Sequence, residues 1–158
     1  MRYWLMKSEP DEFSIQDLQN RPNQTEGWDG VRNYQARNFM RDGMSEGDLA
    51  FFYHSNTKVP GVVGIMRISR EGYPDDTAFD PEDPHYDPKS NLDNPRWYRV
   101  DVTFERELER VIPLSEIKAY ADELEGFPLV RKGNRLSVMP VDKAHWDFVL
   151  SLENEPAE

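Results

Sequence analysis

Short apolar runs and one alternating stretch mark the predicted β-strands of this chain. Between residues 98 and 105, apolar residues alternate with polar ones, a pattern typical of a strand that is buried on one face only. The other runs are nearly continuous, which indicates strands that are buried on most sides. They are YWLMK (3–7), LAFFYHS (49–55), VVGIMRI (62–68) and RLSVMPV (135–141).

Capping residues locate short helices between these strands. Ser14 is placed as an N-cap with Asp17 three residues further on, close to a capping box, and this predicts a helix over 15–20. Three further helices follow from the same kind of signal. They are expected near 34–41 after Asn33, near 116–124 after Ser115, and after Asp142.

The order of these elements predicts an α+β fold, a small mixed β-barrel of five or six strands with helices packed around it. A doubly wound sheet does not fit, because the strands do not alternate regularly with long helices and no glycine fingerprint follows the first strand. Residues 71–95 are rich in Asp, Pro and Asn and have no periodicity. They predict a long loop, and loops of this length tend to be functional or mobile.

Composition limits the class of protein. The chain has 158 residues, of which 37% are hydrophobic and 12% aromatic, enough for one ordinary domain with one core. We expect neither a membrane span nor a signal peptide, because no apolar run reaches about 18 residues and the first residues lack the apolar region of a leader. Because cysteine is absent, disulfides and thiolate chemistry are excluded and the expected location is cytoplasmic.

The net charge of −11 is unevenly distributed. Residues 1–70 contain 9 Lys and Arg against 9 Asp and Glu, whereas residues 71–158 contain 10 against 21. Phosphate binding needs local positive potential, which the chain as a whole does not offer. A surface built from the first part could still contact a phosphate, and the acidic second part could instead dock a protein partner.

Three motifs point weakly to other chemistry. FDPEDPHYDP (79–88) places carboxylates close to His85, but its spacing fits no calcium or zinc signature, and Asp-Pro pairs start turns for local reasons. Ser8, His54 and an acidic residue could form a nucleophilic triad only if folding brought them together. The GVVG stretch at 61–64 resembles a G-x-x-G clamp for nucleic acid, yet its valines run into a strand.

The stretch GWDGVRNYQARN (27–38) indicates a pocket for a flat polar ring. Trp28 stands between nearby glycines, and Trp97 falls out of phase with the alternating strand, which places it opposite the apolar stripe. Two such rings could sandwich a nucleobase. Polar side chains at strand and helix ends could read the base edge: Lys7, Ser8, Asn33, His54 and Ser55.

Each of these residues also has a plain structural interpretation. The two tryptophans could simply close the barrel ends, Asn33 could be only a helix cap, and His54 could be a core histidine with its hydrogen bonds satisfied. The arginines could form a solvated face or bind the phosphates that flank a base. They are Arg32, Arg37 and Arg41.

Seven segments, in order, resemble the EVE domain family and span about residues 2–152. They are WLMKSEP (4–10), GWDGVRNYQARN (27–38), FFYHS (51–55), PGVVG (60–64), WYRVDV (97–102), IPLSEIK (112–118) and RLSVMPV (135–141). The resemblance implies one EVE domain over 1–152, with residues 153–158 as a frayed tail outside the pattern. It also implies a PUA-like fold, a bent barrel with helices at its rim that is related to the YTH readers of methylated adenine.

Family members are thought to read modified nucleobases by flipping them into an aromatic pocket, with no established catalytic residue and no cofactor. We therefore expect a non-catalytic domain that binds DNA or RNA carrying a methylated or hydroxymethylated base. The alternative is an enzyme or sensor for a free nucleotide or another small ring compound. Carried over from the family, the pocket residues are Lys7, Ser8, Trp28, Asn33, Tyr53, His54, Ser55 and Trp97, with Arg32 beside Asn33.

Overall fold

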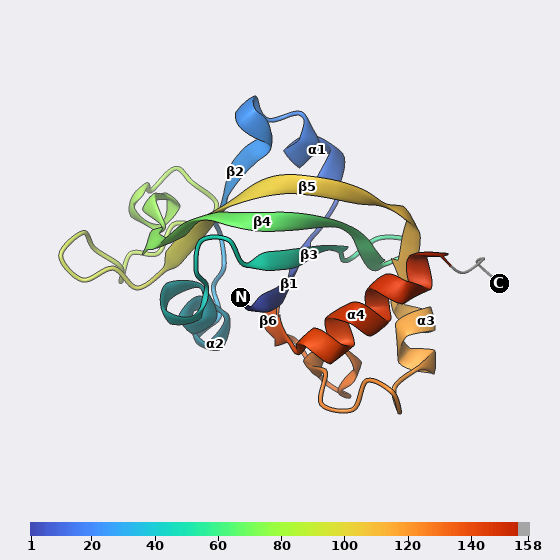
Figure 1. Cartoon of the computed structure of the whole chain (residues 1–158). Coiled ribbons are helices and arrows are strands. Elements are labelled where there is room, and N and C mark those ends of the chain that lie inside the picture. Colours follow the sequence, from blue (N-terminus) through green and yellow to red (C-terminus); the bar gives the residue numbers. More distant parts are fainter. Residues whose placement is uncertain (155–158) are drawn as a thin grey trace.

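Six strands form one bent sheet in the order β2-β5-β4-β3-β1-β6 (Figure 1). The computed structural model describes residues 1–154. Neighbouring strands are antiparallel except β1 and β3, which run parallel. The strands are β1 (Tyr3–Ser8), β2 (Thr25–Trp28), β3 (Leu49–His54), β4 (Gly61–Pro74), β5 (Tyr98–Pro113) and β6 (Val138–Val141).

Short helices flank this sheet. In Figure 1, α3 and α4 lie together below one half of the sheet, α2 lies below the other half, and α1 lies above it beside β2. They are α1 (Ile15–Gln19), α2 (Tyr34–Asn38), α3 (Leu114–Ala119) and α4 (Lys143–Ser151). Single helical turns occur in addition at Pro22–Gln24, Phe39–Gly43, Asp76–Phe79, Pro128–Val130 and Leu152–Asn154. The predicted α+β class is confirmed, and the expected five or six strands of a bent barrel are six strands of one bent sheet with flanking helices. No helix within residues 1–154 is long and apolar enough to cross a membrane.

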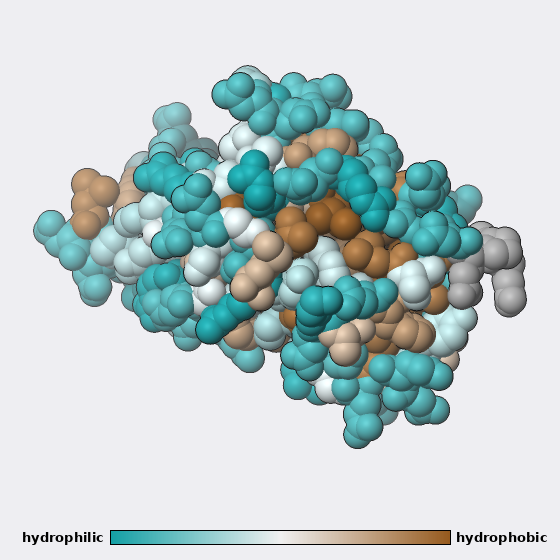
Figure 2. All heavy atoms as spheres, in the orientation of Figure 1, coloured by the Kyte–Doolittle hydropathy of each residue, from teal (hydrophilic) through white to brown (hydrophobic). Residues whose placement is uncertain are grey.

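Each face of the sheet carries its own hydrophobic core. On β1, Trp4 packs into the core that α1 covers, whereas Leu5 packs into the core that α4 covers. On β3, Phe52 and Phe51 divide in the same way, and the Phe51 ring stacks on Trp146 of α4 at 3.9 Å between centroids. Two covered faces explain why these strands are continuous apolar runs. Figure 2 shows hydrophilic residues over most of one side, with hydrophobic ones gathered where α4 meets the sheet.

Strands β4 and β5 are longer than the pattern predicted. The expected strands at 62–68 and 98–105 extend to Pro74 and Pro113. The register between them shifts at four places, where the regular pairing of the two strands is interrupted. The short edge strand β2 was not predicted at all, because TEGW holds a glycine and no alternating pattern.

The predicted helix starts near Ser14 and Asn33 are confirmed. Ser14 Oγ accepts a hydrogen bond from Asp17 N at 3.1 Å, and the Asp17 carboxylate accepts one from Ser14 N at 2.9 Å. Asn33 Oδ1 accepts from Ala36 N at 3.0 Å. Gly64 of the GVVG stretch is a packing residue, because a Cβ there would lie 2.8 Å from the carbonyl oxygen of Arg106. This stretch is therefore part of β4 and no clamp.

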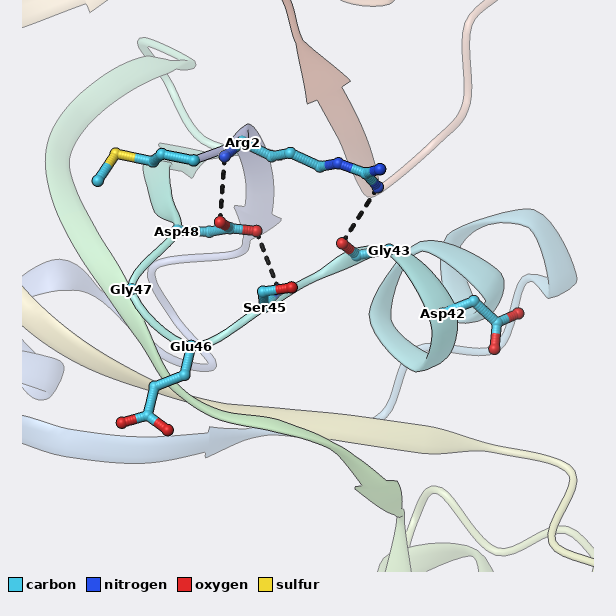
Figure 3. Close-up of a pocket in the computed structure, with 8 residues that line it drawn as sticks. Arg2, Asp42, Gly43, Ser45, Glu46, Gly47 and Asp48 are labelled. Atoms are coloured by element: carbon cyan, nitrogen blue, oxygen red, sulfur yellow. Dashed lines mark hydrogen bonds between the residues drawn. The ribbon is translucent and has the colours of Figure 1, made fainter.

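A buried carboxylate ties the start of the chain to the turn before β3. Asp48 is 3% exposed and accepts hydrogen bonds from Trp4 Nε1 at 3.0 Å and from the backbone nitrogens of Arg2 and Ser45 at 3.1 and 2.9 Å. Figure 3 shows the hollow that this arrangement leaves, with the Arg2 guanidinium donating to the carbonyl oxygen of Gly43 at 3.3 Å. The polar groups that line this hollow are bonded to one another and connect the start of the chain to the turn before β3.

The predicted frayed tail begins too early. Glu153 is 9% exposed, and its carboxylate accepts from Arg106 Nη2 at 2.6 Å and from Glu109 N at 3.0 Å. Glu153 therefore belongs to the packed domain, while residues 155–158 of the expected tail lie outside the described part of the chain.

Candidate nucleic-acid interface

A cavity of about 590 Å³ opens between the end of β1, the start of α1, β2 and the loop after β4. This volume lies within the range of about 300–1,000 Å³ that is typical of small-molecule sites. We call it the base cavity. Its lining residues are Lys7, Ser8, Glu9, Glu12, Phe13, Arg21, Glu26, Gly27, Trp28, Asp29, Pro84 and His85.

The aromatic wall of the base cavity is fixed by edge-to-face contacts. Trp28, at the end of β2, is only 7% exposed. Its ring meets Phe13 at 6.2 Å and 84°, and Phe52 at 5.3 Å and 80°. Because aromatic pairs prefer this arrangement, the indole is held in one orientation before any ligand arrives.

The end of β1 supplies the polar residues that were predicted there. Ser8 Oγ donates to the carbonyl oxygen of Phe13 at 2.6 Å and so fixes the approach to α1. Lys7 Nζ lies 5.6 Å from the centre of the Tyr53 ring. Burial, and then the charge of Lys118, lower the pKa of Lys7, and burial raises the pKa of Tyr53 to about 12. Lys7 is thus a half-buried cation near a second cation.

Asp29 places a carboxylate in the lining directly after Trp28. Its side chain is 38% exposed and lies 3.8 Å from Arg99 Nη1. Partial burial, and then the nearby charge of Asp75, raise the pKa of this carboxyl. A carboxylate at this position can accept a hydrogen bond from a base-edge amino group.

The opposite lip of the cavity is held by a second, fully buried carboxylate. Asp75 accepts hydrogen bonds from Gly30 N at 2.9 Å, Arg32 Nη1 at 3.0 Å and Thr77 Oγ1 at 2.6 Å. Burial alone would raise its pKa, but the bonds from Thr77, Gly30 and Arg32 outweigh it and lower the pKa. Arg32 Nη2 also donates to the carbonyl oxygen of His85 at 2.6 Å, so Arg32 positions the loop that carries His85 into the lining.

Local turns hold the loop at 79–88. Asp80, Asp83 and Asp87 each accept a hydrogen bond from the backbone nitrogen two residues further on, at 3.0, 2.8 and 2.9 Å. This is the local role that Asp takes in turns. In the part of the chain that the structure describes, no group of three His, Asp or Glu side chains is arranged to hold a metal ion.

The structure brings three of the eight predicted pocket residues to the base cavity. Those three are Lys7, Ser8 and Trp28, and the five that lie elsewhere are Asn33, Tyr53, His54, Ser55 and Trp97. Some of the lining residues that were not predicted stand next to these three, since Asp29 follows Trp28 and Glu9 follows Ser8. Phe13 could have been found as the hydrophobic residue before the Ser14 cap.

The sandwich of Trp28 and Trp97 is not formed. Trp97 is 7% exposed, stacks on Tyr34 at 5.0 Å between centroids, and donates Nε1 to the Asp87 carboxylate at 2.6 Å. It precedes β5, which begins at Tyr98, so strand parity does not govern its direction. Trp97 was expected to be accessible to a ligand, but the loop after β4 covers it.

Ser8 and His54 do not form a nucleophile and base pair. Ser8 Oγ is bonded to a backbone carbonyl, and His54 Nε2 accepts from the backbone nitrogen of Ile15 at 3.1 Å. Ser55 contributes its backbone nitrogen, which donates to the carbonyl oxygen of Ser8 at 3.0 Å. All three therefore join β1, β3 and α1 rather than prepare a reaction.

We expect His54 to make the fold less stable under mild acid. Burial, opposed by the charge of Glu107, lowers the pKa of its imidazole from the ordinary value of 6.5. Below about pH 6.5, His54 becomes protonated in the unfolded chain but stays neutral in the folded chain, because a protonated Nε2 cannot accept the hydrogen bond from Ile15 N. The free energy of unfolding should therefore fall as the pH drops from 6.5 toward the folded pKa, with no such effect above 6.5.

Urea unfolding at about pH 7.5 and about pH 5.5 measures this loss, with His54→Gln as the variant that does not titrate. Because His85 and His145 are present in both proteins, the difference between them isolates His54. The same pH dependence in both would contradict the assignment.

The arginines predicted to bind phosphates are engaged within the protein. Arg32 holds Asp75 and the His85 loop as described. Arg37 Nη1 donates to the carbonyl oxygen of Arg96 at 2.9 Å, and Arg41 pairs with Asp42 at 2.8 Å. Each of these three side chains therefore has a carboxylate or carbonyl partner from the protein itself.

Comparison with known proteins gives a match to the EVE domain over residues 2–152. The chain belongs to the EVE domain family. Thymocyte nuclear protein 1 of Homo sapiens is 51% identical over 168 residues, covering 97% of this chain and 74% of that protein. The same protein of Danio rerio is 54% identical over 167 residues, covering 96% and 72%.

Solved structures agree over the whole EVE domain. The crystal structure of human THYN1 protein in complex with 5-methylcytosine containing DNA is 48% identical, with a TM-score of 0.95, and covers 99% of this chain and 100% of that chain. A protein from Pseudomonas syringae is 50% identical, with a TM-score of 0.90, and covers 96% and 99%. The expectation of a cytoplasmic location is contradicted, because the curated relatives are named as nuclear proteins.

Proposed function

We propose that this EVE domain binds DNA carrying a modified cytosine and holds that base, without catalysis, in the base cavity. One observation carries the proposal. A chain with a TM-score of 0.95 to this one was solved with 5-methylcytosine containing DNA, and this chain has a cavity with a fixed aromatic wall. A base inside a duplex must be extruded to reach such a cavity, which costs a few kcal/mol and is easiest for a weakly paired or unpaired base.

The chemistry of the lining fits cytosine. Stacking on an aromatic side chain stabilises a bound base by about 1–3 kcal/mol, and Trp28 and Phe13 offer such surfaces. Cytosine presents an amino group at N4 as a donor, and Asp29 offers a carboxylate acceptor beside Trp28. The ring rather than its phosphate is expected to enter, because Glu9, Glu12 and Glu26 also line the cavity.

The bonds of Ser8 and His54 to the backbone support a binding role over an enzymatic one. Binding to RNA and the boundary between the domain and its tail stay predictions.

The test is a binding titration of Asp29→Ala with a short DNA that carries one 5-methylcytosine. We expect affinity to fall by roughly 5- to 150-fold, because a good contact to a base edge contributes about 1–3 kcal/mol of discrimination. Asp29→Asn, which keeps an acceptor oxygen, should lose less. Measurement by fluorescence anisotropy at fixed salt gives each dissociation constant.

The matched control for lost negative charge is Asp147→Ala. Asp147 lies on α4 and pairs with Lys143 at 2.8 Å, away from the base cavity lining. This variant should bind the DNA with the same affinity as the wild-type protein. Equal affinities for Asp29→Ala and Asp147→Ala would exclude Asp29 as the base-reading carboxylate.

A further inference from the structure

A second hollow of about 350 Å³ shares Lys7 with the base cavity. It lies between α3 and the segment that follows the turn at Pro128–Val130. We call it the basic hollow, because its charged lining residues are all cations and none is a carboxylate. They are Lys7, Lys118, Arg131 and Lys132.

The charges of the two neighbouring sites are opposite in sign. The base cavity has four carboxylates in its lining, contributed by Glu9, Glu12, Glu26 and Asp29, against the two cations Lys7 and Arg21. Such a cavity favours the amino edge of a base and repels its phosphate. A nucleotide whose base enters there must place its backbone where the potential is positive, and the basic hollow is the adjoining surface of that kind.

The cations of the basic hollow are also available. Within residues 1–154, no carboxylate lies within 4.0 Å of the charged nitrogens of Lys118, Arg131 or Lys132. This distinguishes them from Arg32 and Arg41, which have carboxylate partners. The mutual repulsion of cations held close together would be relieved by a bound anion.

A neutral donor adds to this lining. Asn134 Oδ1 accepts from Leu136 N at 3.3 Å, which orients the amide. Its Nδ2 is buried and has no hydrogen-bond partner. Buried donors are normally satisfied, so this amide is a donor without a partner beside the hollow.

We propose that the basic hollow holds the DNA backbone phosphate next to the base in the base cavity, with Lys7 between the two sites. This inference rests on the proposed function, since the base cavity sets where the backbone leaves the protein. It places the phosphate contacts on α3 and residues 131–132 rather than on Arg32, Arg37 and Arg41.

The experiment compares the salt dependence of DNA binding for Lys118→Ala and for the double variant Arg131→Ala/Lys132→Ala. The probes are short duplexes with one 5-methylcytosine or with unmodified cytosine. For each phosphate that a variant no longer neutralises, the slope of log K against log salt should become shallower by about 0.9. Affinity should fall by a similar factor for both duplexes, because phosphate contacts carry no base information.

The control is Lys143→Ala, which removes one positive charge outside the basic hollow. Lys143 lies beside the first residues of β1, whereas Lys7 lies near the opposite end of that strand. Slopes for the hollow variants that equal the Lys143→Ala slope would overturn the inference. The ratio of affinities for the two duplexes separates this outcome from failure of the proposed function. No preference for 5-methylcytosine, together with shallower slopes, would remove the modified-base function and keep the phosphate site.

Discussion

Replacing Trp28 with alanine will remove binding of 5-methylcytosine DNA and will also weaken the fold. The indole lines the base cavity, so its loss removes a stacking surface that contributes about 1–3 kcal/mol per base. It is also 7% exposed and contacts Phe13 and Phe52, so truncation leaves a void in the core at a cost of about 3–5 kcal/mol in unfolding free energy. Urea unfolding and a titration with the methylated duplex measure the two effects.

Because both effects come from one side chain, the binding loss must be separated from unfolding. Trp28→Phe keeps an aromatic wall and should retain part of the affinity. Val149→Ala truncates a fully buried side chain in the other core, so it should lower stability while leaving the affinity of the folded protein unchanged. If Trp28→Ala binds normally at a temperature where it is folded, the base does not enter this cavity.

Asp75→Ala should destabilise the protein by about 3–5 kcal/mol, among the largest effects of any single polar substitution in this chain. The change leaves the guanidinium of Arg32, the backbone nitrogen of Gly30 and the hydroxyl of Thr77 without their acceptor. It also frees the loop that brings His85 to the base cavity, so DNA affinity should fall as well. Chemical denaturation and the same binding titration give both numbers.

A double-mutant cycle with Arg32→Ala tests whether the ion pair itself is responsible. The two substitutions should be far from additive, because the second removes a charge that the first left unpaired. The exposed pair of Arg41 and Asp42 serves as the control, and Asp42→Ala should change stability little. Additive costs for Arg32 and Asp75 would show that the pair is not coupled.

The pKa of Asp75 gives this experiment a pH signature. Because the folded pKa is lowered from the ordinary value of 3.8, the stabilisation is complete at neutral pH and disappears as the pH falls through the folded pKa. The difference in stability between the unmodified protein and Asp75→Ala should therefore shrink in strong acid.

The elements that depend on neighbouring residues could be predicted from the sequence. The cap at Ser14, the cap at Asn33 and the alternation after Tyr98 all act over a few residues, and the structure has each of them. The register between β4 and β5 could not be predicted, because its four shifts depend on how two distant strands meet. Parity also gave no information on Trp97, which lies outside the strand.

Part of the base cavity could also be predicted from short stretches of sequence. Lys7, Ser8 and Trp28 stand at strand ends, where the fold does bring them together. The amides and arginines that follow Trp28 in sequence were expected to accompany it, but they do not line the cavity, because Arg32 bonds to Asp75, Asn33 caps α2 and Arg37 bonds to the carbonyl oxygen of Arg96. His85 enters the lining from more than fifty residues away in sequence, which only the tertiary structure determines.

Average charge does not show which cations lack a carboxylate partner within the fold. The first part of the chain was favoured because its net charge is 0, yet its arginines are engaged within the fold. Lys118, Arg131 and Lys132 belong to the part with a net charge of −11. Their positive potential is local, because none of the acidic residues around them in sequence lines the basic hollow.

The two edges of the sheet bear on how this protein behaves at high concentration. An exposed edge strand is a template on which a second chain can add its own strand, and this is a common start of aggregation. Here the edge strands β2 and β6 have four residues each, whereas β4 and β5 in the interior have 14 and 16. Gly27 in β2 and Pro140 in β6 weaken both edges further as templates. Both terminal strands of the sheet are thus short templates for the addition of a strand from a second chain.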